Sequence, residues 1–162
     1  MSPIKPIKPI KPVKPILPDK SYPIYCSPIN YQYAHPYSDL DETQVFYGLV
    51  KHKIKTPAGI HVNIALNLPP KIKINRVVFS YKVSNSRSYI SRVILVERNK
   101  LEYNTFYNDS TPLINTSGTE NELFVDNVEP AGPISLLLSM DFTNEVDIIE
   151  IGAITVYVKD VE

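Results

Sequence analysis

The sequence lacks tryptophan, and it has one cysteine and five glycines among its 162 residues. The single cysteine, Cys26, has no partner for an internal disulfide, but it would permit a disulfide to a second copy in an oxidising environment. Five glycines are too few for a loop that cradles phosphate, and no Gly-x-Ser-x-Gly nucleophile motif occurs. The composition therefore argues against a phosphate-binding loop and against a serine hydrolase of that type.

Long apolar runs are missing as well. No segment approaches the roughly 18 consecutive apolar residues of a membrane helix. A lysine or proline interrupts the N-terminus at every third step, so we find no apolar core of a secretory signal peptide. We therefore expect no membrane insertion, and a location outside a cell or on a particle surface would be reached without a recognisable signal peptide.

Proline is abundant instead, with 15 residues, and the first of them form a strict repeat. Every third residue from Pro3 to Pro18 is proline, mostly with an Ile-Lys pair between successive prolines. Proline restricts φ to the polyproline II value and pushes the preceding residue toward extended geometry. Residues 1–20 are therefore predicted to form an extended polyproline II arm.

Polyproline II has three residues per turn, so the repeat places each residue type on its own edge of the arm. One edge is branched aliphatic, and we predict that it docks on another subunit: Ile4, Ile7, Ile10, Val13 and Ile16. A second edge is basic and would face acidic residues of the acceptor: Lys5, Lys8, Lys11 and Lys14.

The length of the arm favours binding to a second copy of the chain. The arm would span roughly 45–50 Å, whereas the domain that follows would have a diameter of roughly 35 Å. Wrapping its own domain would require bending, which polyproline II resists. A trimeric stalk, a ligand for SH3 or WW domains, and a stiff spacer are the alternatives.

Residues 21–43 form a second region, rich in tyrosine and proline. They show no helical period, and their prolines are too frequent for a central strand. We predict an extended strap whose rings lie against the domain or a neighbour, carried by Tyr22, Tyr25, Tyr31 and Tyr33. Cys26 belongs to this strap, where it would be placed for an intersubunit disulfide.

Residues 44–162 show short runs with the alternation that is typical of β-strands. One face of the sheet is predicted to carry Val77, Phe79, Tyr81 and Val83, with Val78, Ser80 and Lys82 facing the other way, and Ile154, Val156 and Val158 likewise alternate with Thr155, Tyr157 and Lys159. Turn-forming residues separate the runs, Gly152 marks a predicted bulge, and no window gives an amphipathic helix. This spacing predicts an all-β fold, an antiparallel β-sandwich with jelly-roll order first and immunoglobulin-like order second. The predicted runs are Gln44–Lys55, Ile60–Leu68, Ile72–Val83, Tyr89–Glu97, Leu101–Phe106, Leu123–Val128, Ile134–Phe142 and Ile148–Val158.

Charge is balanced overall, with 17 basic and 17 acidic residues, but it is unevenly distributed. Bases dominate residues 51–100, and acids dominate residues 120–162. Two explanations stay open: the basic arm meets the acidic third of a neighbour, or basic and acidic strands pair inside one sheet. A neutral chain with an acidic third is a poor binder of phosphate backbones, so no nucleic acid partner is expected.

Candidate catalytic and metal-binding side chains are sparse. His52 and His61 would meet only if their strands formed a hairpin, and no acid accompanies them. The acidic groups at 39–42 and 141–147 lack the spacing of an EF-hand loop, so we predict solvated turn acids. We expect no catalytic residue, no metal, no cofactor, and a protein that is not an enzyme.

Sugar binding is the strongest ligand hypothesis. Carbohydrate modules on sandwich folds stack aromatic rings on pyranose faces, and this chain has 11 tyrosines. The missing tryptophan argues against such a platform, as does the concentration of tyrosines in the strap. Tyr103, Phe106 and Tyr107 would form a small loop platform, although core packing or subunit contact explains them equally well.

Together these features favour a non-catalytic structural subunit that assembles with copies of itself into a filament or particle through its arm. A β-domain with an arm resembles the organisation of bacterial or spore surface filaments and of virus or phage coat components. That resemblance implies an extracellular or particle-surface location. The alternative is a carbohydrate-binding or adhesin β-sandwich module, with the arm as a spacer and glycans as partners.

Overall fold

The fold is given by a computed structural model, which describes residues 21–28, 31–33, 40–46, 49–54, 59–99 and 102–161. For residues 31–33, 40–46 and Ile54 the description covers the backbone alone. The predicted arm, with its aliphatic docking edge and its lysines, lies outside the described residues. The strap is described in parts.

The described residues form eleven strands and no helix. None of them therefore belongs to a helix that is long and apolar enough to cross a membrane. In chain order the strands are β1 Tyr22–Cys26, β2 Tyr31–Tyr33, β3 Leu40–Phe46, β4 Leu49–Ile54, β5 Gly59–Leu66, β6 Ile72–Val83, β7 Tyr89–Asn99, β8 Glu102–Asp109, β9 Thr119–Val128, β10 Ile134–Asp141 and β11 Ile149–Asp160.

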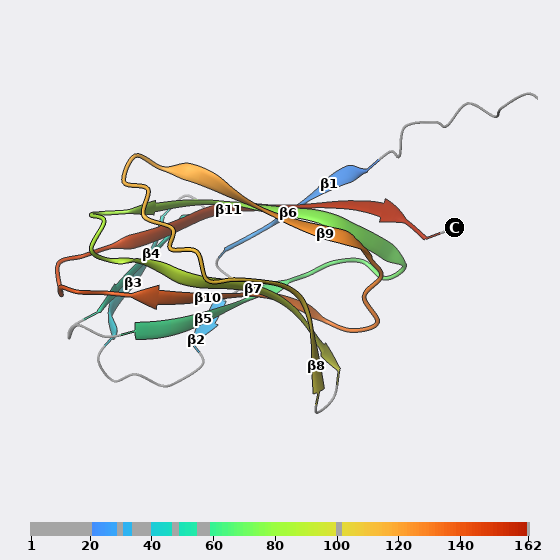
Figure 1. Cartoon of the computed structure of the whole chain (residues 1–162), viewed down its shortest axis with the longest axis horizontal. Coiled ribbons are helices and arrows are strands. Elements are labelled where there is room, and N and C mark those ends of the chain that lie inside the picture. Colours follow the sequence, from blue (N-terminus) through green and yellow to red (C-terminus); the bar gives the residue numbers. More distant parts are fainter. Residues whose placement is uncertain are drawn as a thin grey trace, which may run out of the picture.

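The strands build two stacked antiparallel sheets (Figure 1). Sheet A has the order β3-β4-β11-β6-β9. Both β4 and β1 pair with the edge of β11 that faces away from β6: β4 pairs with residues 149–151, and β1 pairs with residues 154–158. Sheet B has the order β2-β5-β10-β7-β8. From β4 onward the order is 4-11-6-9 in one sheet and 5-10-7-8 in the other, which is the jelly-roll arrangement. The predicted antiparallel β-sandwich with jelly-roll order is confirmed.

The core lies between the two sheets and is filled by alternate residues of their strands. On β6 the predicted inward face is confirmed, because Val77, Phe79, Tyr81 and Val83 are all buried. On β11, residues 154, 156 and 158 point into the same core, while the residues between them face outward. The residues between these core positions therefore form the outer face of sheet A.

Most strand predictions agree with the structure, with one clear difference. The predicted run Gln44–Lys55 is two strands, β3 and β4, which form a hairpin with Phe46 opposite Leu49. The bulge predicted at Gly152 is confirmed, because the pairing of β11 with β6 shifts register between Ile151 and Ile154.

The strap contributes backbone to both sheets. Its first part, β1, pairs with β11 from Tyr22 opposite Val158 to Cys26 opposite Ile154. Proline cannot donate to a sheet ladder, so Pro23 is tolerated because β1 lies at a sheet edge. Its second part, β2, pairs with β5 in sheet B. The strap thus ties the start of the described chain to both layers of the sandwich.

Asp147 is a buried carboxylate that joins two loops at one end of the sandwich. Ser88 Oγ and Thr143 Oγ1 donate to its Oδ2 at 2.5 and 3.3 Å, and Asn85 Nδ2 donates to its Oδ1. Burial alone would raise the pKa of Asp147, but these hydrogen bonds and the charge of Arg87 outweigh it and lower the pKa. The prediction of a solvated turn acid is wrong for this residue.

Replacing Asp147 by alanine is expected to lower the free energy of unfolding by about 2–4 kcal/mol, because the buried Ser88 hydroxyl loses its acceptor and Asn85 and Thr143 lose hydrogen bonds to a charged group. Urea denaturation followed by circular dichroism measures this loss. Glu145→Ala is the matched control, since Glu145 is an exposed acid in the same loop. Equal denaturation midpoints for the two variants would show that the Asp147 hydrogen bonds do not stabilise the fold.

Candidate functional site

Four tyrosine and phenylalanine side chains of the described part are notably exposed. The exposed fractions are 38% for Tyr22, 78% for Tyr25, 73% for Tyr103 and 68% for Phe124. Single exposed rings are normal on a protein surface, whereas several exposed rings on one face indicate a binding site. Tyr103 lies on β8 in sheet B, whereas Tyr25 and Phe124 both lie on the outer face of sheet A.

One row of residues crosses four strands of sheet A on its outer face. Pro23 of β1 is opposite Tyr157 of β11, Tyr157 is opposite Arg76 of β6, and Arg76 is opposite Phe124 of β9. Neighbouring strands are about 4.8 Å apart, so the backbones at Tyr157 and Phe124 are separated by roughly 10 Å. Two rings therefore flank a guanidinium on a sheet surface.

Alternation along each strand is what turns these side chains outward. On β9, Leu123 and Val125 are buried on either side of Phe124. On β11, the neighbours of Tyr157 at positions 156 and 158 are buried in the core. On β1, Ile24 and Cys26 pack against the core, which leaves Tyr25 on the solvent side. Because the period of a strand is two, the outward position of each ring is fixed by its buried neighbours.

Arg76 is held in place by contacts on both sides. The centre of its guanidinium lies 3.9 Å from the centroid of the Tyr157 ring, which is a cation–π contact. Its Nη1 lies 3.5 Å from Oε2 of Glu122 on β9. A guanidinium has five N–H donors in a planar fork, so donors remain for a ligand after these contacts are made.

The next row lies beside the first and extends the same surface. Tyr25 is opposite Thr155, Thr155 is opposite Val78, and Val78 is opposite Glu122. We call the group formed by Tyr25, Arg76, Phe124 and Tyr157 the aromatic platform. It combines flat apolar rings with a fixed donor, and Glu122 adds an acceptor at its margin.

A shallow pocket of about 390 Å³ lies on the same face, toward the other end of β6. We call it the Gly152 pocket. Gly152 and Ser80 lie against each other, and charged side chains from β6, β9 and β11 line it. The complete lining is Leu49, Ser80, Tyr81, Lys82, Ser117, Gly118, Thr119, Glu120, Glu150 and Gly152.

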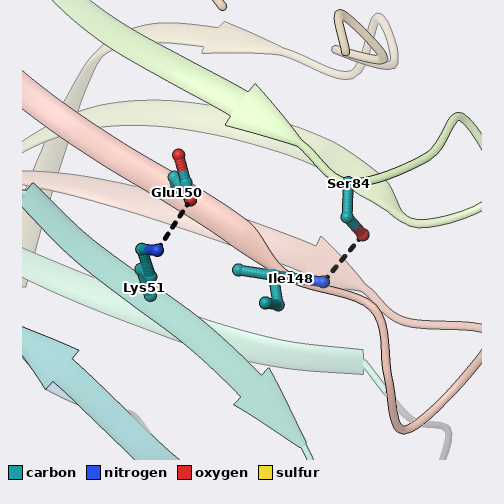
Figure 2. A network of polar contacts seen from close by, with 4 residues as sticks. All are labelled: Lys51, Ser84, Ile148 and Glu150. Carbon is teal, nitrogen blue, oxygen red and sulfur yellow. Dashed lines mark hydrogen bonds and ion pairs between the residues drawn. The ribbon is translucent and has the colours of Figure 1, made fainter.

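Polar contacts hold the strands together around this pocket. Lys51 Nζ of β4 lies 3.4 Å from Glu150 Oε1 of β11, and the two side chains point toward each other (Figure 2). At the nearby strand ends, the backbone N–H of Ile148 donates to Ser84 Oγ at 2.9 Å (Figure 2). The Lys51–Glu150 and Arg76–Glu122 pairs each join a residue of the basic region to one of the acidic region. They agree with the explanation in which basic and acidic strands pair inside one sheet.

A second pocket, of about 360 Å³, lies at an end of the sandwich between residues 66–72 and 130–134. Its lining is dominated by proline and aliphatic residues, including Pro69, Pro70 and Pro130. Its polar side chains are Asn67 and Lys71, and its lining holds no aromatic ring and no carboxylate. The outer face of sheet A, which combines rings, carboxylates, cations and hydroxyls, is the better candidate site.

The predicted strap residues lie in different environments. Tyr22 Oη donates to Asp160 Oδ1 at 2.8 Å, which raises the pKa of Tyr22. Tyr25 faces solvent on the aromatic platform. Tyr31 and Tyr33 lie on β2, where the backbone alone is described.

Cys26 is a free, half-buried thiol that packs against the core. Burial raises its pKa, so the thiol is protonated at neutral pH. The predicted intersubunit disulfide stays a prediction, and forming it would require the side chain to leave the core.

The alternative aromatic group Tyr103, Phe106 and Tyr107 does not form a loop platform. All three residues lie on β8, and Phe106 and Tyr107 pack against the core while Tyr103 is exposed. The histidines do not come together either. His52 is on β4 in sheet A and His61 is on β5 in sheet B, because the chain crosses between sheets at that point.

Within the described ranges, no group of three or more histidine, cysteine, aspartate or glutamate side chains is placed to hold a metal ion. His61 Nδ1 instead shares a hydrogen bond with Ser139 Oγ at 2.9 Å.

Sequence reasoning missed Phe124 and Arg76 as site residues. The alternation of Tyr157 with Val156 and Val158 did predict that its ring faces away from them, on the outer side of the sheet. The same argument applied to Leu123 and Val125 would have turned Phe124 outward. The row itself depends on strand register, which the sequence alone does not give.

The sequence matches no family model and no curated protein. Solved structures with the same fold do exist. A mutant of a family 29 carbohydrate-binding module aligns with a TM-score of 0.51 and 13% identity, over 85% of this chain and 92% of that chain. A family 61 carbohydrate-binding module in complex with β-1,4-galactotriose aligns with a TM-score of 0.51 and 14% identity, over 83% and 90%. At this identity the likeness shows the β-sandwich fold.

Proposed function

We propose that this chain is a non-catalytic carbohydrate-binding module whose ligand stacks on the aromatic platform of sheet A. The observation that carries the proposal is the row in which Tyr157 and Phe124 flank Arg76 on a solvent-facing sheet surface. The hypothesis of sugar binding is kept, but its site moves from the predicted loop platform of Tyr103, Phe106 and Tyr107 to the outer face of sheet A.

The chemistry of the platform suits a sugar. A pyranose ring has apolar C–H faces that pack on flat aromatic rings, and hydroxyls at its edge that need donors and acceptors. Phe124 and Tyr25 supply exposed rings, and Tyr157 holds the guanidinium of Arg76 over its own ring. Arg76 supplies N–H donors, and Glu122 supplies carboxylate acceptors. A preformed surface of this kind binds without ordering long flexible side chains, which limits the entropic cost of binding.

The structural neighbours support the choice of ligand class. Both of the neighbours described above are carbohydrate-binding modules, and one was solved with β-1,4-galactotriose. We therefore propose β-1,4-linked hexose chains as the ligand class. Such a function would operate outside the cell or on its surface, where polysaccharides occur, which agrees with the predicted extracellular location.

The test is binding of the full chain to neutral β-1,4-linked glucan, mannan and galactan, measured by affinity gel electrophoresis and isothermal titration calorimetry. Retardation or measurable heat with at least one of them supports the proposal. The Tyr103→Ala variant is the control, because it removes an exposed ring from sheet B and should bind as the wild type does. Absence of binding to all three polysaccharides would refute the proposed function.

Self-assembly through the arm stays a prediction, because the docking edge from Ile4 to Ile16 lies outside the described residues. Deleting residues 2–18 tests it separately from glycan binding. If the arm joins subunits, the full chain should elute as an oligomer and the shortened chain as a monomer in size-exclusion chromatography. If both the full chain and the shortened chain elute as monomers, the arm does not join subunits and acts as a spacer. Glycan affinity per site is expected to be equal in the two chains.

A further inference from the structure

Resting on the proposed function, we infer that the ligand is an extended, uncharged oligosaccharide that lies along β6, from the aromatic platform to the Gly152 pocket. The platform would hold one part of the chain by stacking, and the pocket would hold another part by hydrogen bonds. The site would then bind long oligosaccharides more tightly than short ones, and neutral ones more tightly than acidic ones. The platform alone predicts neither preference.

The platform and the pocket are parts of one continuous surface. On β6 the outward positions are Arg76, Val78, Ser80 and Lys82, in that order, and neighbouring side chains cover Val78 to 7% exposure. Arg76 belongs to the platform, and Ser80 and Lys82 line the pocket. Six residues of strand separate Arg76 from Lys82, which is a distance of roughly 20 Å. That length fits an oligosaccharide of several units and is far too long for one monosaccharide.

The pocket exists because small residues lie at its centre. A Cβ added to Gly152 would lie 3.2 Å from Ser80 Cβ, which is closer than side chains normally pack. A larger residue at Gly152 would therefore fill the space between β6 and β11. The pocket wall from β9 begins at Gly118, whose φ of 87° is a left-handed conformation that glycine adopts without strain. The adjacent turn is fixed by the hydrogen bond from the Ser117 N–H to Asn115 Oδ1, at 2.9 Å.

The pocket lining combines a mainly apolar surface with groups that can hydrogen-bond sugar hydroxyls. Lys82 can donate, and the carboxylates of Glu120 and Glu150 can accept. The hydroxyls of Ser80, Ser117 and Thr119 can do both. Because each sugar hydroxyl is at once a donor and an acceptor, a mixed lining of this kind satisfies it better than a lining of one charge sign.

The charges along this path argue for an uncharged ligand. Between Arg76 and Lys82 the carboxylates Glu120, Glu122 and Glu150 are matched by Arg76, Lys82 and the Lys51 that pairs with Glu150, whereas Lys73 and Lys159 lie beyond the platform. Two of the three cations already contact a carboxylate, at 3.4 Å for Lys51 and 3.5 Å for Arg76. A uronic acid or sulfated sugar would meet no net positive potential here and would lie beside three carboxylates.

The experiment measures affinity of the full chain for neutral β-1,4-linked oligosaccharides from disaccharide to hexasaccharide, by isothermal titration calorimetry. The sugar is the one that binds best in the polysaccharide screen. We expect the hexasaccharide to bind at least about tenfold more tightly than the disaccharide. A hexasaccharide of uronic acids is expected to bind at least about tenfold more weakly than the neutral one.

Two variants locate the length dependence in the pocket. Gly152→Val fills the pocket, and Glu120→Ala removes an exposed acceptor without altering the core. With Gly152→Val, hexasaccharide affinity should fall to the disaccharide level while disaccharide affinity stays unchanged. Glu120→Ala should reduce hexasaccharide affinity about threefold to tenfold. Glu102→Ala, an exposed acid on β8 of sheet B, is the control.

The outcomes separate this inference from the proposed function. If disaccharide and hexasaccharide bind equally, or if neither pocket variant affects the hexasaccharide, the extended path is wrong while a platform-only binding module survives. If the uronic acid chain binds as tightly as the neutral one, the charge argument is wrong. If no oligosaccharide binds the wild-type chain, the proposed function itself has failed.

Discussion

Replacing Phe124 and Tyr157 together by alanine is expected to reduce glycan affinity about 100-fold, and each single replacement about tenfold. Stacking a sugar on the exposed Phe124 ring removes on the order of 50 Å² of apolar surface from water, which contributes about 1.3 kcal/mol. Losing Tyr157 releases the Arg76 guanidinium that lies over its ring, which removes a fixed hydrogen-bond donor of about the same worth. A loss of about 1.4 kcal/mol corresponds to a factor of ten in affinity. Isothermal titration calorimetry with the best-binding polysaccharide or hexasaccharide measures the effect.

The controls for this prediction come from the same chain. Tyr103→Ala removes a ring of similar exposure from sheet B and should leave affinity unchanged. Tyr157→Phe keeps the ring under Arg76 and should retain most of the affinity, whereas Tyr157→Ala also releases the guanidinium. Thermal unfolding of every variant shows whether the fold is intact. Wild-type affinity in the folded double variant would contradict the assignment of the site.

Lowering the pH from 7 to 5 is expected to reduce the free energy of unfolding by about 2 kcal/mol through His52 alone. His52 is fully buried on β4, and its burial lowers its pKa from 6.5 to about 4. Between these two values the unfolded chain binds a proton that the folded chain excludes. The contribution is therefore complete above pH 6.5 and is lost progressively as the pH falls toward 4.

Urea denaturation at pH 7, 6 and 5 measures this dependence. The His52→Leu variant should show little change in unfolding free energy over the same range, because ordinary carboxyl groups titrate mainly below pH 5. His61→Ala serves as the control, since that exposed imidazole lies on the other sheet. Equal pH dependence in the wild type and in His52→Leu would contradict the account.

Local sequence patterns predicted the architecture well. Alternation over Ile72–Val83 gave β6 with the bounds that the structure shows, and Gly152 marked the bulge in β11. The missed boundary between β3 and β4 has a local cause. The sequence between the two strands, residues 47–48, has no proline and one glycine, Gly48, so the turn signal was weak.

The site was harder to predict because it depends on pairing between distant segments. Arg76, Phe124 and Tyr157 come from three strands that are far apart in the sequence, and their contact follows from register. Alternation showed which way Tyr157 faces, but it did not show what lies beside it. The sequence left open that His52 and His61 could meet across a hairpin, but their strands, β4 and β5, belong to opposite sheets.

Asp147 illustrates a second kind of limit. Its position in a turn with other acids predicted exposure to solvent. In the structure Ser88 and Asn85, from a loop about 60 residues earlier, surround its carboxylate. No local pattern shows that these two loops meet at one end of the sandwich.

The most direct test of the central claim is a titration of the uniformly ¹⁵N-labelled full chain with the best-binding neutral hexasaccharide, followed by NMR. The account predicts that the largest chemical-shift changes occur along the outer face of sheet A, at Arg76, Ser80, Phe124, Gly152 and Tyr157. Changes confined to sheet B, for example around His61 and Arg92, would contradict it, and so would the absence of any change at saturating sugar.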